Sequence, residues 1–214
     1  MYFRNRTEAG QILARKLISY KGKPGVVLAV PRGGVPVAYE VARVLELPLE
    51  LILTKKIGHP MNPEYAIGAA SLEDYFVVPH EQVSPRYITG EVERIRQTLR
   101  SMQSKFMGNR EPEKLTGKTL IVVDDGIATG NTLLATIQVL KKANPAKIII
   151  AVPVASEQAA EKLAEVADAV VAIHIPEFFY GVGAFYEDFS QVSDEEVLHF
   201  LEKWHEEFTA GRHA

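Results

Sequence analysis

The sequence predicts an α/β fold built on a central parallel sheet of about five strands flanked by helices. Five short apolar runs are continuous rather than alternating, which is typical of strands covered on both faces of a parallel sheet. Helical patterns separate most of these runs, and this alternation favours a doubly wound sheet with right-handed crossovers. The runs are GVVLAV (25–30), LELILT (49–54), TLIVVD (119–124), KIIIAV (147–152) and DAVVAIHI (168–175).

Length and composition limit what the chain can do. Its 214 residues are enough for one sizeable core, so we expect a single domain over residues 1–214. The formal net charge of −3 argues against a nucleic-acid partner, and the lack of cysteine excludes disulfides and thiolate chemistry. No apolar run approaches the roughly 18 residues that span a bilayer, and the N-terminus lacks the apolar core of a signal peptide. We therefore expect a cytoplasmic protein that acts on small molecules, without a membrane partner.

Helices are expected at residues 35–45, 131–143 and 157–167, each following one of the apolar runs or the loop after it. Near the C-terminus, Ser193 and Glu196 have the spacing of a capping box, which predicts the start of a last helix. This helix would bury four apolar residues: Val197, Leu198, Leu201 and Trp204.

Residues 55–118 form an insertion that is too long for a simple strand-to-helix connection. It begins with KKIGHPMNPEYAIGAAS, whose many turn formers predict a loop. A helix is predicted over residues 84–107, because Ser84 can cap it and Pro85 suits its first turn. Apolar residues at helical spacing form one stripe on this helix: Ile88, Val92, Ile95, Leu99, Met102 and Phe106. We expect the stripe to pack on the same domain, with a dimer seam or a lid over a site as the alternatives.

The stretch VVDDGIATGNTLL (122–134) contains the strongest functional signal in the sequence. Asp124 and Asp125 end a predicted strand, which is where open parallel sheets bind ligands. The loop 126–132 turns directly into a helix, so backbone N–H groups and the helix N-terminus can face one anion. Its glycines permit close approach and its threonines add hydroxyl donors. This chemistry suits a phosphate monoester, and the lack of a Gly-Lys-Ser/Thr ending disfavours a nucleotide triphosphatase.

The two aspartates are poor ligands for a phosphate but good acceptors for vicinal hydroxyls, such as those of a ribose. A ligand with a diol beside a phosphate would therefore use both halves of the stretch. An acidic strand end followed by an ordinary tight turn is the alternative. A phosphorylation receiver domain also has an aspartate pair, but on an early strand and without this loop of glycines and hydroxyls.

VVDDGIATGNT resembles the 5-phosphoribosyl 1-pyrophosphate (PRPP) motif of type I phosphoribosyltransferases. IGHPMNPEYAIGAAS and PEFFYGVGAFYEDFSQV extend the resemblance over nearly the whole chain, to an uncharacterised bacterial group of phosphoribosyltransferase-like proteins. The resemblance implies that Asp124 and Asp125 are catalytic and hold the ribose hydroxyls, with Mg²⁺ bound mostly by donor oxygens and water. It assigns the 5′-phosphate to the loop residues Gly126, Ile127, Ala128, Thr129, Gly130, Asn131 and Thr132.

AVPRGGVPVA (29–38) resembles the pyrophosphate loop of the same family, which commonly contains a non-proline cis peptide bond. Arg32 would bind the pyrophosphate through its guanidinium, and Gly33 and Gly34 through their backbone N–H groups. A plain turn is the alternative. Two residues at the end of the second predicted strand would assist catalysis at the pyrophosphate, or else form a solvated strand end: Lys55 and Lys56.

The aromatic segment 175–192, with the last helix, corresponds to the hood that binds the acceptor in this family. Phe178, Phe179 and Tyr180 could stack on a flat ring, and packing in the core is the alternative. Ala128 stands where hypoxanthine-guanine enzymes have an aspartate near N7 of the purine. This difference argues against an oxopurine acceptor handled by that route.

The resemblance implies transfer of a phosphoribosyl group from PRPP–Mg²⁺ to an unidentified acceptor, such as a nucleobase, with release of pyrophosphate. This activity would place the protein in nucleotide metabolism. A PRPP-binding regulator without transferase activity is the main alternative, and a hydrolase acting on a phosphorylated sugar is another. A homodimer is a further family expectation.

Overall fold

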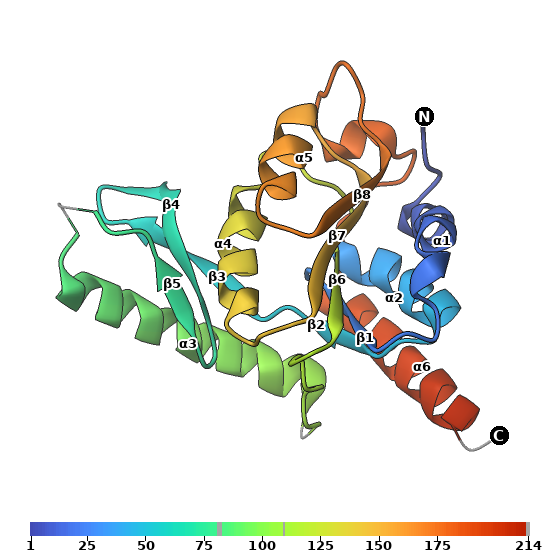
Figure 1. The fold of residues 1–214 in the computed structure, drawn as a ribbon, viewed down its shortest axis with the longest axis horizontal. Helices are drawn as coiled ribbons and strands as arrows, with labels where there is room; N and C mark the ends of the chain where they lie inside the picture. The colour runs from blue at the N-terminus through green and yellow to red at the C-terminus, as the bar shows by residue number, and fades with distance from the viewer. Residues whose placement is uncertain (81–82, 109, 213–214) are drawn as a thin grey trace. The chain divides into compact units, whose positions relative to one another are not determined.

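The computed structural model describes residues 1–80, 83–108 and 110–212, and the chain divides into two compact units (Figure 1). The first unit comprises Met1–Ile52, Pro112–Gly130 and Pro145–Ala214. The second comprises Leu53–Glu111 and Asn131–Asn144. Within the described residues, no helix has both the length and the apolar character needed to span a membrane.

The first unit is built on a parallel sheet of five strands in the order β2-β1-β6-β7-β8, which confirms the predicted fold class. The strands are β1 (Gly25–Ala29), β2 (Leu49–Leu51), β6 (Thr119–Val123), β7 (Lys147–Val154) and β8 (Ala169–His174). The apolar runs are continuous because β1 is buried along its whole length, and β6 and β7 along nearly all of theirs. Strand β6 lies between β1 and β7, so its carboxyl end is at the centre of the sheet edge formed by the carboxyl ends of the strands.

The second predicted strand is shorter than the run 49–54 suggests. Ile52 N donates to Ala29 O over 2.8 Å, and the ladder stops there because β1 itself ends at Ala29. Thr54 already begins β3, a strand of the second unit.

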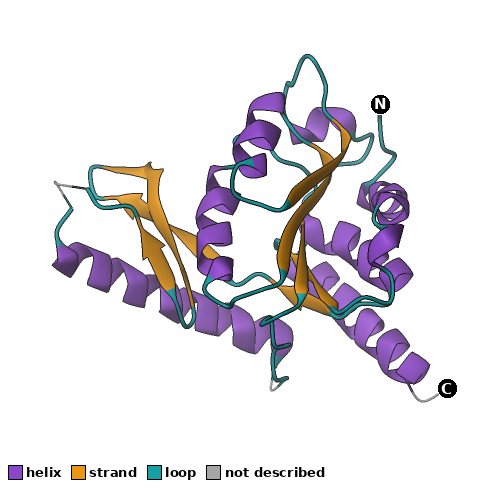
Figure 2. Ribbon diagram, in the orientation of Figure 1, coloured by secondary structure: helices purple, strands orange, loops and turns teal. Residues whose placement is uncertain are grey.

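Helices flank the strands of the first unit (Figure 2). They are α1 (Arg6–Lys16), α2 (Gly34–Leu45), α5 (Glu157–Ala164) and α6 (Asp194–Arg212), with 3-10 turns η1 (Ile18–Tyr20) and η2 (Val182–Phe185). Helices α2 and α5 match the predicted crossovers, although α5 ends three residues before the predicted end at 167. Helices α1 and α2 pack closely at Gly10, where a Cβ would lie 2.8 Å from Val37 O.

Helix α1 was not predicted, although the sequence contains a signal for it. The Asn5 side chain caps the helix by accepting from Glu8 N over 3.0 Å. In return, the Glu8 carboxylate accepts from Arg4 N over 2.7 Å. This reciprocal pattern is a variant of the capping box, with Asn in place of Ser or Thr.

The capping box predicted for the last helix is present. Ser193 Oγ accepts from Glu196 N over 3.1 Å, and the Glu196 carboxylate accepts from Ser193 N over 2.8 Å. Of the four apolar residues predicted to be buried by α6, Leu198 is only half-buried, and the others are buried: Val197, Leu201 and Trp204.

The second unit contains a three-stranded antiparallel sheet in the order β3-β4-β5, where the sequence predicted a loop. Its strands are β3 (Thr54–His59), β4 (Asn62–Ser71) and β5 (Tyr75–Val77). The prediction failed because two glycines taken as turn formers lie inside strands. A Cβ on Gly58 would lie 2.5 Å from Pro63 O, and a Cβ on Gly68 would overlap Phe76 O. Glycine is therefore needed at both places for close approach of neighbouring backbones, not for a turn.

Two helices pack on this sheet: α3 (Pro85–Met107) and α4 (Asn131–Lys141). Ser84 caps α3 as predicted, accepting from Tyr87 N over 3.2 Å. All residues of the predicted stripe except Phe106, which is buried outside this cluster, pack with Ile57, Ile67 and Ala70. Ala69 packs instead with Ala135 and Val139 of α4. Since neighbouring residues of a strand point to opposite faces, α3 and α4 cover opposite faces of the sheet.

The stripe of α3 can be tested at its centre, where Leu99 is fully buried. Leu99→Ala should lower the free energy of unfolding by about 2–5 kcal/mol, because it leaves a cavity between α3 and the sheet. Urea unfolding followed by circular dichroism measures this. The control is Arg100→Ala on the exposed side of the same helix, which should cost less than about 1 kcal/mol. Equal costs for the two variants would show that the stripe does not pack on the sheet.

Candidate functional site

The acid pair Asp124–Asp125 follows directly after β6, at the centre of the sheet edge. Asp124 Oδ1 accepts from Asp125 N over 2.9 Å. Asp125 Oδ2 accepts from Arg6 Nε, also over 2.9 Å. One oxygen of each carboxylate is thus held by the protein.

The environment of the acid pair favours proton sharing. Burial raises the pKa of Asp124 well above its ordinary value, and the neighbouring charge of Asp125 raises it further. Burial also raises the pKa of Asp125, against the opposing effect of the Arg6 guanidinium. Because the two acids interact this closely, they titrate as a pair. Such a pair repels a phosphate and attracts hydroxyl donors.

The loop from Val30 to Gly33 joins β1 to α2 and lies against the acid pair. Val30 N donates to Val123 O over 2.9 Å. A Cβ on Gly33 would overlap the Asp125 carboxylate, and a Cβ on Gly34 would lie 2.7 Å from Val123 O. The two glycines therefore allow the loop backbone to approach the acid pair closely. The peptide bond between Pro31 and Arg32 is cis.

Arg32 extends from this loop to the start of the last helix. Its Nε lies 2.7 Å from Asp194 Oδ1, and its side chain is 46% exposed. The guanidinium is thus held by a carboxylate and is still accessible from solvent.

The loop after the acid pair is fixed to the neighbouring strand by three hydrogen bonds. Ile127 N donates to Val154 O over 2.9 Å, and Ser156 N donates to Ile127 O over the same distance. Ser156 Oγ also donates to Ala128 O over 2.6 Å. Ala128 and Thr129 are exposed, and their backbone N–H groups meet no acceptor among the described residues. The loop therefore presents two free N–H donors on a rigid base.

Two glycines shape the same loop. A Cβ on Gly126 would lie 2.5 Å from Val182 Cγ1 in η2, so the hood packs directly on the loop. Gly130 has a φ of +70°, a conformation that glycine adopts without strain. The last two predicted phosphate ligands, Asn131 and Thr132, open helix α4 in the second unit.

Arg6 and Tyr186 contact the acid pair and were missed by sequence reasoning. The Tyr186 hydroxyl donates to Asp125 O over 2.6 Å. Arg6 lies 119 positions from Asp125 in the chain, which is why no local motif reveals it. The only signal available was the capping pattern of Asn5 and Glu8, which places Arg6 in the first turn of a helix.

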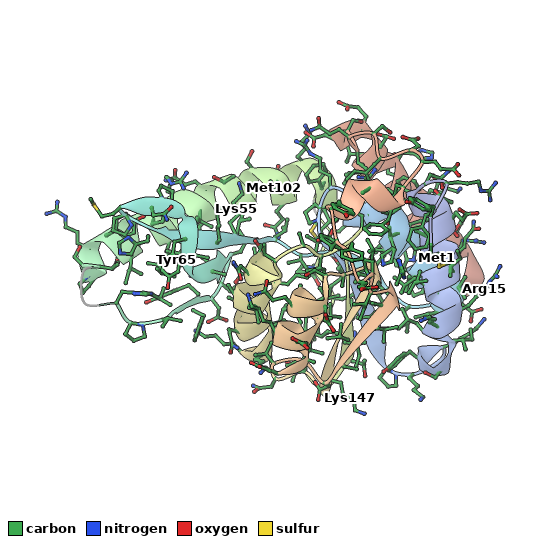
Figure 3. The ribbon with its side chains drawn as sticks, turned by 90° about the horizontal axis from the view of Figure 1, so that it is seen from above. Met1, Arg15, Lys55, Tyr65, Met102 and Lys147 are labelled. Atoms are coloured by element: carbon green, nitrogen blue, oxygen red, sulfur yellow. The ribbon has the colours of Figure 1, made fainter. Side chains whose placement is uncertain are left out.

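The other predicted residues fall into two groups. Phe179 packs in the apolar cluster of the hood, with its ring centroid 5.8 Å from that of Phe185. Phe178 and Tyr180 are 66% and 84% exposed. Lys55 and Lys56 lie on β3 in the second unit, where Lys55 is exposed (Figure 3). The structure of the first unit thus brings together the acid pair, the Arg32 loop and residues 126–130.

Comparisons with known proteins identify the family of the chain. Residues 4–190 match the family model described as the phosphoribosyl transferase domain. A Mycobacterium tuberculosis protein whose name assigns it provisionally to the phosphoribosyl transferases is 38% identical over 96% of this chain. The chain spans only 48% of the length of that relative.

Solved structures show the same fold. The crystal structure of the TT1426 protein from Thermus thermophilus has a TM-score of 0.88 and 39% identity, covering 95% of this chain and 99% of that one. The AQ2163 protein from Aquifex aeolicus, at 12% identity and a TM-score of 0.50, shares the fold over 83% of this chain and 78% of its own. With the family model matching most of its length, the chain belongs to the phosphoribosyl transferase domain family.

Proposed function

We propose that the protein transfers a phosphoribosyl group from PRPP to an acceptor and releases pyrophosphate. The observation that carries the proposal is the placement of three different chemistries at one sheet edge. These are a pair of carboxylates at Asp124–Asp125, a loop with free N–H groups at 126–130, and a loop with an accessible arginine at 30–34. PRPP contains a diol, a phosphate and a pyrophosphate, which match these three in turn.

The ribose of the donor would bind at the acid pair. The protein holds one oxygen of each carboxylate, and the pair would accept from the two vicinal hydroxyls. The two aspartates are consecutive in the chain, which suits a ligand with hydroxyls on adjacent ring atoms. The raised pKa of Asp124 means that ligand hydroxyls replace a shared proton as hydrogen-bond donors.

The 5′-phosphate would bind on the loop that follows. Backbone N–H groups of Ala128 and Thr129 are free to donate, and the Thr129 side chain is exposed beside them. We extend the phosphate site to Asn131 and Thr132 because α4 starts there, and the N-terminus of a helix attracts anions.

The pyrophosphate would bind at the loop 30–34. Arg32 has a planar guanidinium suited to two phosphate oxygens, and it would exchange Asp194 for the ligand. The N–H group of Gly33 would contribute further, whereas that of Gly34 already donates to Val30 O over 3.0 Å. We keep Lys55 and Lys56 as candidate ligands. Mg²⁺ would neutralise pyrophosphate charge while bound mostly by donor oxygens and water.

The reaction breaks the bond between C1 of the ribose and an oxygen of the pyrophosphate. The pyrophosphate leaves with the electron pair of this bond. An electron pair of the acceptor forms the new bond to C1. Positive charge develops on the ribose between these events, and the nearby Asp124–Asp125 pair favours it electrostatically. The protein then acts mainly by orienting the two reactants. The exposed rings of Phe178 and Tyr180 are the candidate contacts for a flat acceptor.

The proposal predicts that the acid pair is required for donor binding. Asp124→Asn and Asp125→Asn should each weaken PRPP–Mg²⁺ binding about 10- to 100-fold, since a hydrogen bond to a charged group contributes about 1.5–3 kcal/mol. Calorimetry measures the affinity. The control is Asp74→Asn, which removes an exposed carboxylate of the second unit that pairs with Lys142. Unchanged affinity in both acid-pair variants would contradict the ribose site.

Transfer is tested separately from binding. Pyrophosphate release by the wild type should appear with at least one member of a panel of nucleobases and small amines, and should be lost in Asp124→Asn. Tight donor binding without release for any acceptor would instead support a PRPP-responsive regulator. Release without any acceptor would indicate hydrolysis.

The acid pair should reduce stability at neutral pH. The folded-state pKa of Asp124 is raised above the unfolded value, so stability falls as the pH rises from the unfolded pKa through the folded pKa. Asn carries no charge and retains the acceptor for Asp125 N. Asp124→Asn should therefore raise the free energy of unfolding at neutral pH.

Urea unfolding at neutral and at acidic pH measures this effect. The gain should shrink in acid, below the ordinary pKa of an aspartate, where Asp124 is uncharged in both folded and unfolded chains. A variant that is less stable than the wild type at neutral pH would show that the carboxylate is accommodated without cost.

A further inference from the structure

Arg6 is a nearly buried cation to which the proposed reaction gives no task. Its side chain is 11% exposed and makes contacts on three sides. Arg6 Nε donates to Asp125 Oδ2 over 2.9 Å, and Arg6 Nη1 donates to Ser190 O over 2.7 Å. The guanidinium carbon also lies 4.0 Å from the centre of the Phe189 ring. These contacts fix both the position and the orientation of the guanidinium.

The N-terminal segment carries Arg6 to the acid pair by pairing with the hood. Phe3 N donates to Phe185 O and Glu187 N donates to Phe3 O, each over 2.8 Å. Asp188 N donates to Arg4 O over 2.9 Å. Asn5 then caps α1, so that Arg6 is the first residue of the helix. The position of Arg6 therefore depends on an ordered hood.

The hood also contacts Asp125 directly, through Tyr186. The Tyr186 hydroxyl donates to the main-chain oxygen of Asp125 over 2.6 Å, while Arg6 binds its side chain. The ring of Tyr186 lies 5.3 Å from that of Phe3, in the same apolar cluster. Both the backbone and the carboxylate of Asp125 are thus held from the hood side.

We propose that Arg6 is a positioning residue for the acid pair: its contacts to Asp125 and Ser190 hold the Asp125 carboxylate beside a positive charge and in the orientation that accepts from the donor ribose. The role in donor binding rests on the proposed function, whereas the effect on the carboxylate does not. Arg6 thereby couples the order of the hood to the state of the ribose site.

The charges around Asp125 support this role. The groups that face it are the Asp124 carboxylate, the Arg6 guanidinium and the Tyr186 hydroxyl, and the nearby Arg32 is paired with Asp194. Burial raises the pKa of both acids, and the charge of Asp125 raises the pKa of Asp124 further. Arg6 opposes these effects and lowers the pKa of Asp125. Without Arg6, the pair would keep a proton to higher pH, and this proton would compete with ribose hydroxyls.

Arg4 offers a matched control in the same segment. It pairs with Glu8 over 2.7 Å on the surface, and its side chain is 72% exposed. Arg6→Gln and Arg4→Gln therefore remove the same charge two residues apart, but only the first removes a contact to the acid pair. Arg6→Lys and Arg4→Lys repeat the comparison with a milder change, since lysine keeps the charge but lacks the fork of donors.

Two measurements on the full chain test the role. Side-chain ¹³C NMR follows the titration of Asp124 and Asp125 without ligand, with signals assigned from the Asn variants. Calorimetry measures the affinity for PRPP–Mg²⁺ at neutral pH. Arg6→Gln should move the titration of the pair to higher pH and weaken donor binding by about tenfold or more. In Arg6→Lys, the acid pair should titrate nearly as in the wild type, and the affinity for PRPP–Mg²⁺ should fall only in part. Both Arg4 variants should match the wild type in titration and in affinity.

The outcomes separate this role from a purely structural one. Circular dichroism shows whether each variant folds. If Arg6→Gln does not fold, the comparison of Arg6→Lys with Arg4→Lys tests the proposal. A titration and an affinity that are the same in the Arg6 and Arg4 variants would overturn the proposal. Failure of the wild type to bind PRPP would contradict the proposed function alone, because the titration of the acid pair is judged without the donor.

Discussion

The candidate site of the first unit is organised around two adjacent carboxylates at the end of a buried central strand. Strand β6 lies between β1 and β7, so its end is enclosed by the connections of both neighbours. The backbone at Gly33 and Gly34 is close enough to exclude a Cβ, and it removes water from Asp124 and Asp125. Burying two acids in this way is unfavourable on its own. It is tolerated because a backbone N–H and the Arg6 guanidinium each bind one oxygen.

The same enclosure connects parts of the chain that lie far apart. The loop after the acids carries Gly126 against Val182, which joins the hood to this loop. The hood pairs with the N-terminal segment, and Arg6, which follows this segment, contacts the acid pair. A ligand at the acid pair would therefore contact a ring of mutually supporting segments rather than a single loop. Such support limits the reorganisation needed as charge develops on a bound ribose.

Sequence reasoning succeeded where the determining interactions are local. The apolar runs of β1, β6 and β7 revealed buried parallel strands, and Ser84 and Ser193 revealed two helix starts. The acid pair and its loop are contiguous, so their joint placement followed from one motif.

Sequence reasoning failed where contacts between distant parts of the chain determine the structure. The glycines of the β3–β4 hairpin were taken as turn formers because their facing backbone is not visible in the sequence. The partners Arg6 of Asp125 and Asp194 of Arg32 are distant in the chain and belong to no motif.

The central claim is that one ligand carries a diol to the carboxylates while its phosphate occupies the neighbouring loop. A crystal structure of the wild type with PRPP and Mg²⁺ tests it most directly. We predict ribose hydroxyl oxygens within about 2.5–3.0 Å of carboxylate oxygens of Asp124 and Asp125. The 5′-phosphate should accept from the N–H groups of Ala128 and Thr129. Density for the donor elsewhere on the molecule, or a ribose turned away from both acids, would contradict the account.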